Sequence, residues 1–135
     1  MSQGFLLCYM AASENNPVEM SYALKYLSDR LRRQTYREFW PCPLAAYYLV
    51  DVSFTDVMEA VDRRVSTNPL PPATLELGRR KRLCVALFHD GVKSRAQGDE
   101  AHCLARMREC YALENRVIVL EWYLARYEVE KAGVA

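Results

Sequence analysis

The chain of 135 residues is long enough for one domain that buries about two-thirds of the surface of its unfolded form. Its apolar fraction of 51%, with 18 basic and 17 acidic side chains, excludes a disordered chain. The net charge of +1 excludes strong attraction of the whole molecule to nucleic acid or to an anionic membrane, although a local patch would escape that average.

The first segment is apolar from Phe5 to Ala12, and a polar loop follows it at 13–16. The apolar run is too short to cross a bilayer and lacks the positive residues that precede the core of a secretory signal. We therefore expect residues 5–12 to form a helix or a strand that packs on the domain, and we expect no membrane partner.

A helix is predicted next, because Asn16 can cap it, Pro17 fits its first turn and Glu19 follows three residues after the cap. The spacing of its apolar residues predicts a buried stripe of Met20, Leu24, Leu27 and Leu31. We expect this helix to end at about Thr35 or Trp40.

The motif Pro41-Cys42-Pro43 ends that helix, because the residue before a proline is steered away from helical torsions. Residues 44–52 are a dense apolar run whose length fits either a strand or a buried helix, and the helical neighbourhood favours a helix. Ser53 and Asp56 have the spacing of an N-cap. Residues 43–65 are therefore expected to be one helix bent near Ser53 or two short helices.

A proline-rich loop at 66–72 is too short to separate domains and is placed inside the single domain 1–135. Pro72 or Thr74 begins the next helix, which carries the basic cluster Arg79, Arg80, Lys81 and Arg82. Four consecutive helical residues point in different directions, so they cannot all face one phosphate backbone. A solvated helix end is the simpler interpretation; nucleic-acid binding or a nuclear address is the alternative.

The pattern of residues 83–115 predicts two helices joined at Gln97-Gly98-Asp99. Gly98 supplies the positive backbone φ that ends the first helix, and Asp99 caps the second. Helical spacing predicts inner faces made of Leu83, Ala86, Leu87, Gly91, Cys103, Met107, Cys110 and Tyr111.

A last helix is expected after Asn115, which would be its N-cap, and it ends near Gly133. The predicted inward stripe of this helix consists of Val117, Leu120, Leu124 and Tyr127. Trp122 lies partly off this stripe, where a large aromatic side chain is either a binding anchor or a part of the packing.

The window from Cys84 to Asn115 resembles a tetratricopeptide repeat, a helix–turn–helix unit of 34 residues. Leu87 stands at its large apolar position, Gly91 at its small position and residues 96–99 at its turn, while Met107 takes the aromatic position. The departures from the pattern are Asp90 at the usual leucine, Ser94 at the usual tyrosine and Asn115 at the usual proline. The resemblance implies a helical-repeat fold and a role in binding another protein.

No motif for catalysis, phosphate binding or metal binding is present, so the sequence favours a non-enzymatic role without a cofactor or metal. The two histidines, His89 and His102, lie on opposite arms of the predicted hairpin and do not form a chelating pair. Five cysteines without a CxxC pair indicate reduced, buried side chains in an intracellular compartment, cytoplasmic or nuclear.

The sequence therefore predicts an all-α single domain of five to six helices, stacked as antiparallel hairpins. Its expected function is protein–protein interaction, with another protein or with a copy of itself; nucleic-acid association through the basic cluster is the alternative. The expected partner-binding residues are Asp90, Lys93, Ser94 and Trp122. Because an unpaired buried carboxylate would be costly, Asp90 should be paired or should face a groove.

Overall fold

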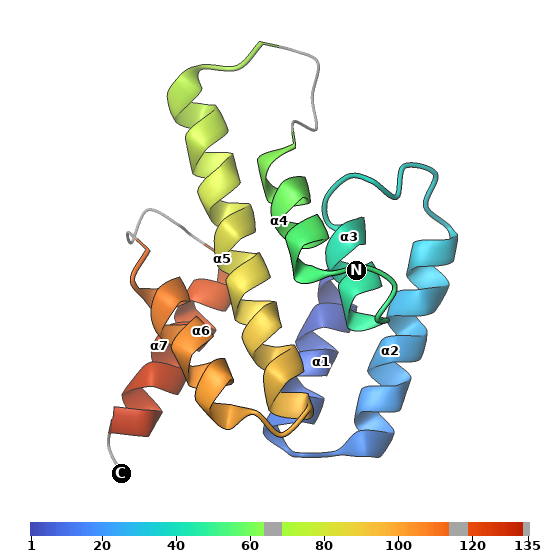
Figure 1. Cartoon of the computed structure of the whole chain (residues 1–135), viewed down its shortest axis with the longest axis vertical. Helices are drawn as coiled ribbons and strands as arrows, with labels where there is room; N and C mark the ends of the chain where they lie inside the picture. The colour runs from blue at the N-terminus through green and yellow to red at the C-terminus, as the bar shows by residue number, and fades with distance from the viewer. Residues whose placement is uncertain (64–68, 114–118, 134–135) are drawn as a thin grey trace.

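The computed structural model describes residues 1–63, 69–113 and 119–133. These residues contain seven α-helices and no strand, so the all-helical fold class is confirmed, while the helix count exceeds the expected five to six. The helices are α1 (Ser2–Ser13), α2 (Pro17–Arg32), α3 (Cys42–Tyr48), α4 (Phe54–Asp62), α5 (Pro72–Ala96), α6 (Glu100–Tyr111) and α7 (Leu120–Gly133) (Figure 1).

Both apolar runs that the sequence left open are helical. The run 5–12 belongs to α1, and most of the run 44–52 belongs to α3 or to the turn that follows it. Within this stretch, the described residues 43–63 form two helices rather than one bent helix. The break is fixed at Ser53, whose hydroxyl accepts from the Asp56 backbone N–H at 3.3 Å while the Asp56 carboxylate accepts from the Ser53 N–H at 2.9 Å.

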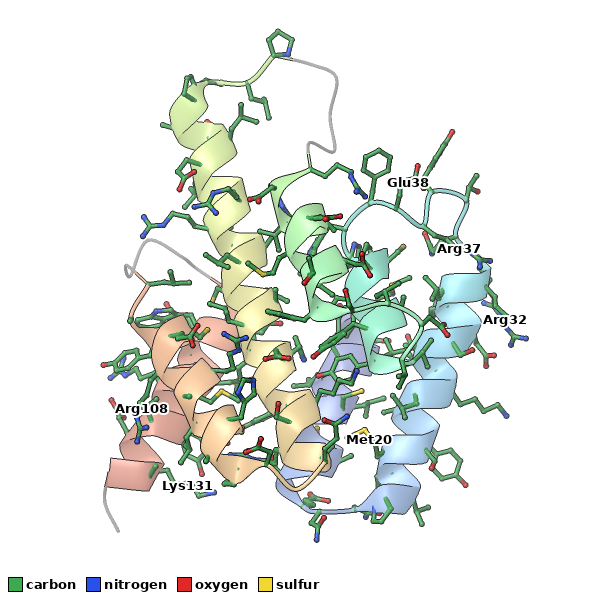
Figure 2. All side chains as sticks on the ribbon, in the orientation of Figure 1. Met20, Arg32, Arg37, Glu38, Arg108 and Lys131 are labelled. Atoms are coloured by element: carbon green, nitrogen blue, oxygen red, sulfur yellow. The ribbon has the colours of Figure 1, made fainter. Side chains whose placement is uncertain are left out.

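Helix α2 begins where the sequence predicted, with the Asn16 side chain accepting from the backbone N–H of Glu19 at 3.1 Å. It ends at Arg32, earlier than expected. The Arg37 guanidinium folds back at this end and donates to the carbonyls of Arg32 and Gln34, at 3.1 Å and 3.3 Å (Figure 2). A side chain from the following loop thus satisfies carbonyls that a longer helix would have bonded internally.

Helix α5 is the centre of the molecule. In Figure 1 it runs through the middle of the fold, with α6 and α7 on one side and α1 to α4 on the other. Helices α1, α3, α4, α6 and α7 all contact it. The largest fully buried apolar side chains come from five of the helices and are Leu27, Leu44, Val57, Val61, Phe88, Val92 and Met107. The core is therefore built around the second half of α5.

The turn between α5 and α6 has the predicted chemistry. Gly98 has a φ of +88°, and the Asp99 carboxylate accepts from the backbone N–H of His102 at 3.1 Å. The two helices approach closely, so that the thiols of Cys84 and Cys110 lie 2.8 Å apart. All five cysteines are free and buried, which confirms their predicted burial.

The predicted inward stripe of the last helix is wrong. Leu120 and Tyr127 are 54% and 56% exposed, whereas Trp122, Ala125 and Glu128 are buried. The actual inner face includes a carboxylate, which a search for apolar periodicity cannot detect. The predicted cap Asn115, the stripe residue Val117 and part of the loop 66–72 lie outside the described residues.

The close packing of α5 on α6 gives a stability prediction. A methyl group at Gly91 would lie 3.2 Å from the Cys103 carbonyl oxygen and 3.1 Å from the Arg106 Cβ, and neither atom moves easily. We expect Gly91→Ala to lower the free energy of unfolding by about 1–2 kcal/mol, because overpacking outweighs the gain in helix propensity.

Gly78 in the same helix is the matched control. Its added methyl group would meet only a terminal nitrogen of the Arg82 guanidinium, at 3.3 Å, which has to shift by only a few tenths of an ångström. Gly78→Ala should raise the free energy of unfolding by about 0.5–1 kcal/mol. Equal effects of the two substitutions in urea denaturation would contradict the close approach at Gly91.

Candidate functional site

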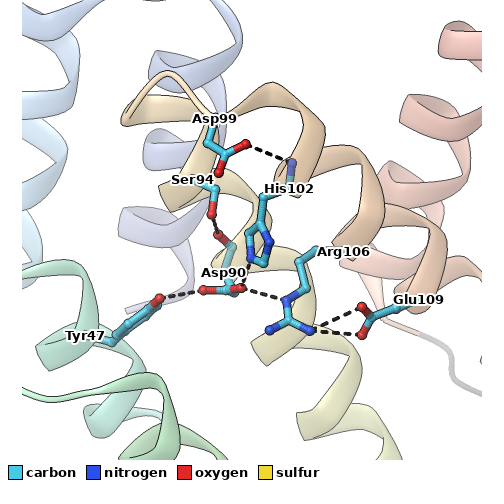
Figure 3. A network of polar contacts seen from close by, with 7 residues as sticks. All are labelled: Tyr47, Asp90, Ser94, Asp99, His102, Arg106 and Glu109. Atoms are coloured by element: carbon cyan, nitrogen blue, oxygen red, sulfur yellow. Dashed lines mark hydrogen bonds and ion pairs between the residues drawn. The ribbon is translucent and has the colours of Figure 1, made fainter.

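Asp90 in the middle of α5 is buried and lies at the centre of a polar network. The Tyr47 hydroxyl of α3 donates to Oδ1 at 2.5 Å, while the His102 ring N–H and the Arg106 Nε–H of α6 donate to Oδ2 at 2.8 Å and 2.7 Å (Figure 3). Arg106 also donates to Glu109 on the outer side of α6. One carboxylate thus connects three helices, which confirms the expectation that Asp90 is paired.

The charge of Asp90 is stabilised by these donors. Burial alone would raise the pKa of its carboxyl group, but the hydrogen bonds from Tyr47, Arg106 and His102 outweigh burial and hold the pKa below its ordinary value. Burial raises the pKa of the Tyr47 phenol, and the hydrogen bond to the negatively charged Asp90 raises it further. At neutral pH the pair is therefore an ionised carboxylate and a neutral phenol.

Two of the other predicted partner-binding residues extend this network. The Ser94 hydroxyl is buried and donates to the Asp90 backbone carbonyl at 2.9 Å. The Lys93 ammonium donates to the Tyr47 backbone carbonyl at 2.7 Å and lies 3.8 Å from the centre of the Tyr47 ring. The structure therefore brings Asp90, Lys93 and Ser94 together, and Asp90 and Lys93 share Tyr47 of α3 as a neighbour.

Trp122, the fourth predicted partner-binding residue, lies apart from the other three. Its indole N–H donates to the Leu113 carbonyl at 3.1 Å, and its ring is buried against Tyr111 and Tyr123. Asp90, Ser94 and Trp122 all have partners within the chain and offer little side-chain surface. Their position assigns them a structural role.

A second buried carboxylate, Glu128 in α7, was not found by sequence reasoning. It accepts from the Tyr9 hydroxyl of α1 at 2.7 Å and from Arg95 of α5 at 2.8 Å. Burial would raise the pKa of Glu128, but these two donors hold it below its ordinary value. The only sequence signal would have been its spacing from Trp122 and Ala125, at three-residue steps along one face.

The basic cluster is largely engaged within the chain. Arg79 donates two hydrogen bonds to Glu76, each at 3.0 Å, and its guanidinium lies 3.6 Å from Asp62 of α4. Arg82 donates to the Val61 carbonyl at 2.8 Å. These contacts join the first half of α5 to α4, so that two of the four cationic side chains already face partners other than a phosphate backbone.

His89 precedes Asp90 but faces another part of the fold. It is buried, its Nδ1 lies 2.6 Å from the Tyr48 hydroxyl, and its Nε2 has no hydrogen-bond partner within residues 1–63, 69–113 and 119–133. Burial holds the pKa of His89 below its ordinary value, and the neighbouring Glu121 only partly offsets this effect. The ring is therefore neutral at pH 7. It lines an open pocket of about 360 Å³ between α1, α5 and α7.

The outer face of α1 and α2 is the second surface feature. A shallow groove between these two helices has an apolar floor that includes Leu7, Met10 and Tyr22, all exposed to solvent. Glu14 and Glu19 lie at one end of this groove.

Comparisons of the chain with protein-family models, with curated proteins and with solved structures found no match. Among the described helices none is both long and apolar enough to span a membrane. The described residues also hold no cluster of three or more side chains with the arrangement of metal ligands.

The Asp90 network gives a prediction on stability and its pH dependence. We expect Asp90→Asn to lower the free energy of unfolding by about 2–3 kcal/mol at pH 7, because three donors lose a charged acceptor in a mostly buried site. The pKa of Asp90 is lowered in the folded state. Its contribution is therefore present above the ordinary carboxyl pKa and is lost as the pH falls through the folded pKa.

Asp29 is the matched control, since its ion pair with Arg32 is exposed. Asp29→Asn should cost about 0.5 kcal/mol or less at pH 7. Urea denaturation between pH 3 and pH 7 measures both variants. The acid slope should be smaller in Asp90→Asn than in the wild type, and an unchanged slope would show that Asp90 is not ionised through this network.

Proposed function

We propose that this chain is a non-enzymatic protein–protein interaction module, a single domain of stacked antiparallel helical hairpins that binds a second copy of itself. The docking surface is the outer face of α1 and α2. The resemblance of residues 84–115 to a tetratricopeptide repeat remains a prediction and suggests the same class of function.

The observation that supports this proposal is the composition of α1. No residue from Ser2 to Ser13 is charged, and the helix exposes Leu7 and Met10 in the groove with α2 although its opposite face already fills the core. A helix that is apolar all round is normally buried on every side. Tyr22 of α2 widens the exposed apolar area in the same groove. A partner that covers this face would remove the apolar surface from water.

Charge along α2 favours a second copy as the partner. Glu19 lies near the start of the helix, the exposed Tyr22 lies in the middle, and the exposed Arg30 and Arg33 lie at or just beyond its end. Glu19 and Arg30 are 11 residues apart, which corresponds to about 16 Å along a helix. On a helical wheel both lie on the side of α2 that faces α1, where the Tyr26 hydroxyl donates to Gln3.

A two-fold interface brings the same patch of two subunits together in opposite directions. The α2 helices would then run antiparallel, with Glu19 of each copy near Arg30 of the other and the apolar residues at the centre. Within the described residues, Glu14 and Glu19 form no ion pair, so they remain available for such a contact. The face is thus complementary to itself in both polarity and charge.

This surface differs from the one expected from the sequence. Asp90, Ser94 and Trp122 are buried, so the proposal assigns the partner contact to exposed residues of α1 and α2 instead. Nucleic-acid association through Arg79 to Arg82 has no comparable support, because Arg79 and Arg82 have partners in α4 and α5.

Replacing a central tyrosine of the face tests the proposal. Tyr22→Glu should raise the dissociation constant of the dimer at least tenfold, because a charge would be buried at the interface. Tyr36→Glu is the matched control, since Tyr36 lies in the loop after α2 and is 69% exposed, compared with 66% for Tyr22. Sedimentation equilibrium over a range of protein concentrations measures both variants. Self-association would be refuted if the wild-type chain were monomeric both at high concentration and after 100-fold dilution.

A charge exchange tests the orientation of the two copies. Glu19→Arg and Arg30→Glu should each weaken self-association, because each places like charges opposite one another. An equimolar mixture of the two variants should associate again, since both contacts then pair opposite charges. Mixing Glu19→Arg with the Tyr36→Glu variant is the control. These two variants should form heterodimers more weakly, because one of the two contacts then pairs like charges. Failure of the mixture to associate, with both variants folded, would exclude the antiparallel arrangement.

A further inference from the structure

The pocket beside His89 has an apolar wall and one polar end. Its wall is formed by α1, α5 and α7 and includes Leu6, Tyr9, Phe88, Val119 and Leu124. The polar end is formed by His89 and Glu121. The volume of about 360 Å³ falls within the range of small-molecule sites and equals that of about a dozen water molecules.

The His89 ring is held in one position. Phe5 and Phe88 lie against it with ring centres 5.2 Å and 5.0 Å away, and the Tyr48 hydroxyl lies 2.6 Å from Nδ1. Burial keeps the Tyr48 phenol protonated by raising its pKa well above the ordinary value. Because the phenol must donate its proton, Nδ1 accepts it and the remaining ring proton is on Nε2.

The Nε2–H group is therefore a donor without an acceptor among the residues that the structure describes. It is buried, and the nearest carboxylate oxygen, Oε1 of Glu121, lies 3.8 Å away, beyond hydrogen-bond distance. Unpaired buried donors are rare, because each costs about 1–3 kcal/mol. An oxygen atom placed about 2.8 Å from both groups would accept from His89 and, if it carried a proton, would donate to Glu121.

We propose that this pocket binds an apolar molecule of about ten non-hydrogen atoms that ends in a hydroxyl group, with the hydroxyl oxygen between His89 Nε2 and Glu121 Oε1. A hydroxyl group both accepts and donates, as these two residues require. A carboxylate would be repelled by Glu121, and an ammonium group could not accept from His89. Water could fill the polar end, but an apolar chain also removes the surrounding wall from water.

Imidazole nitrogen spectra test the proposal directly, because the chain holds only two histidines. Addition of 1-octanol should shift the Nε2 signal of His89 in a saturable way. The signals of His102, which lies in the Asp90 network on the other side of α5, should stay unchanged. Absence of a saturable His89 shift up to the solubility limit of 1-octanol would overturn the proposal.

Matched ligands separate the hydroxyl from the apolar chain. Heptyl methyl ether is an isomer of 1-octanol that can accept from His89 but cannot donate to Glu121, so it should bind at least tenfold more weakly. Octanoate should not bind. Equal affinity of the ether and the alcohol would show that the pocket binds through its apolar wall alone. Tighter binding of octylammonium than of 1-octanol would overturn the hydroxyl assignment.

Two substitutions on α1 localise the binding without touching the buried core. Leu6 lines the pocket and is 38% exposed, while the adjacent Leu7 lines the groove with α2 and is 42% exposed. Leu6→Trp should abolish the octanol-induced shift, and Leu7→Trp should retain it. The same shift in both variants would place the alcohol elsewhere. Because Leu7 belongs to the proposed dimer face, this pair also distinguishes failure of the pocket from failure of self-association.

Discussion

The ionised carboxylate of Asp90 is the constraint on which the arrangement of the helices depends. A buried charge is tolerated only where donors surround it, and the donors here come from two of the helices that contact α5: Tyr47 of α3, and His102 and Arg106 of α6. The requirement that three donors converge on one carboxylate fixes the positions of α3 and α6 along the helix axis.

Two adjacent residues of α5 each contact one of two adjacent tyrosines of α3. Tyr47 donates to Asp90, while Tyr48 contacts the ring of His89. Consecutive residues on a helix are about 100° apart, so the two contacts engage different sides of α5. Helix α3 has only seven residues and would not be stable alone. The two phenols hold it in place and connect the Asp90 network to the pocket beside His89.

The parts of this fold that the sequence predicts depend on local chemistry. The caps at Asn16 and Ser53 and the turn at Gly98 each follow from a few neighbouring residues, and all three were confirmed. Polar contacts that lie outside the apolar pattern were not predictable in the same way. The return of Arg37 onto α2 shortened that helix, and Glu128 with Arg95 rotated α7 so that Trp122 became buried. Both errors arise from polar partners that lie far away in sequence or outside any apolar pattern.

The same difference between what a sequence shows and what only the fold shows applies to the candidate site. Asp90 stood out in the sequence because a carboxylate occupied an apolar position, but a single sequence could not show whether that carboxylate faced a partner protein or the inside of the fold. The structure places its donors within the chain, so the polar interior is satisfied and the proposed binding is assigned to other surfaces. Helix α1 provides two of them, because Leu6 borders the pocket and Leu7 the groove with α2. Neighbouring apolar residues on an uncharged helix thus serve different surfaces, which explains why α1 carries no polar face of its own.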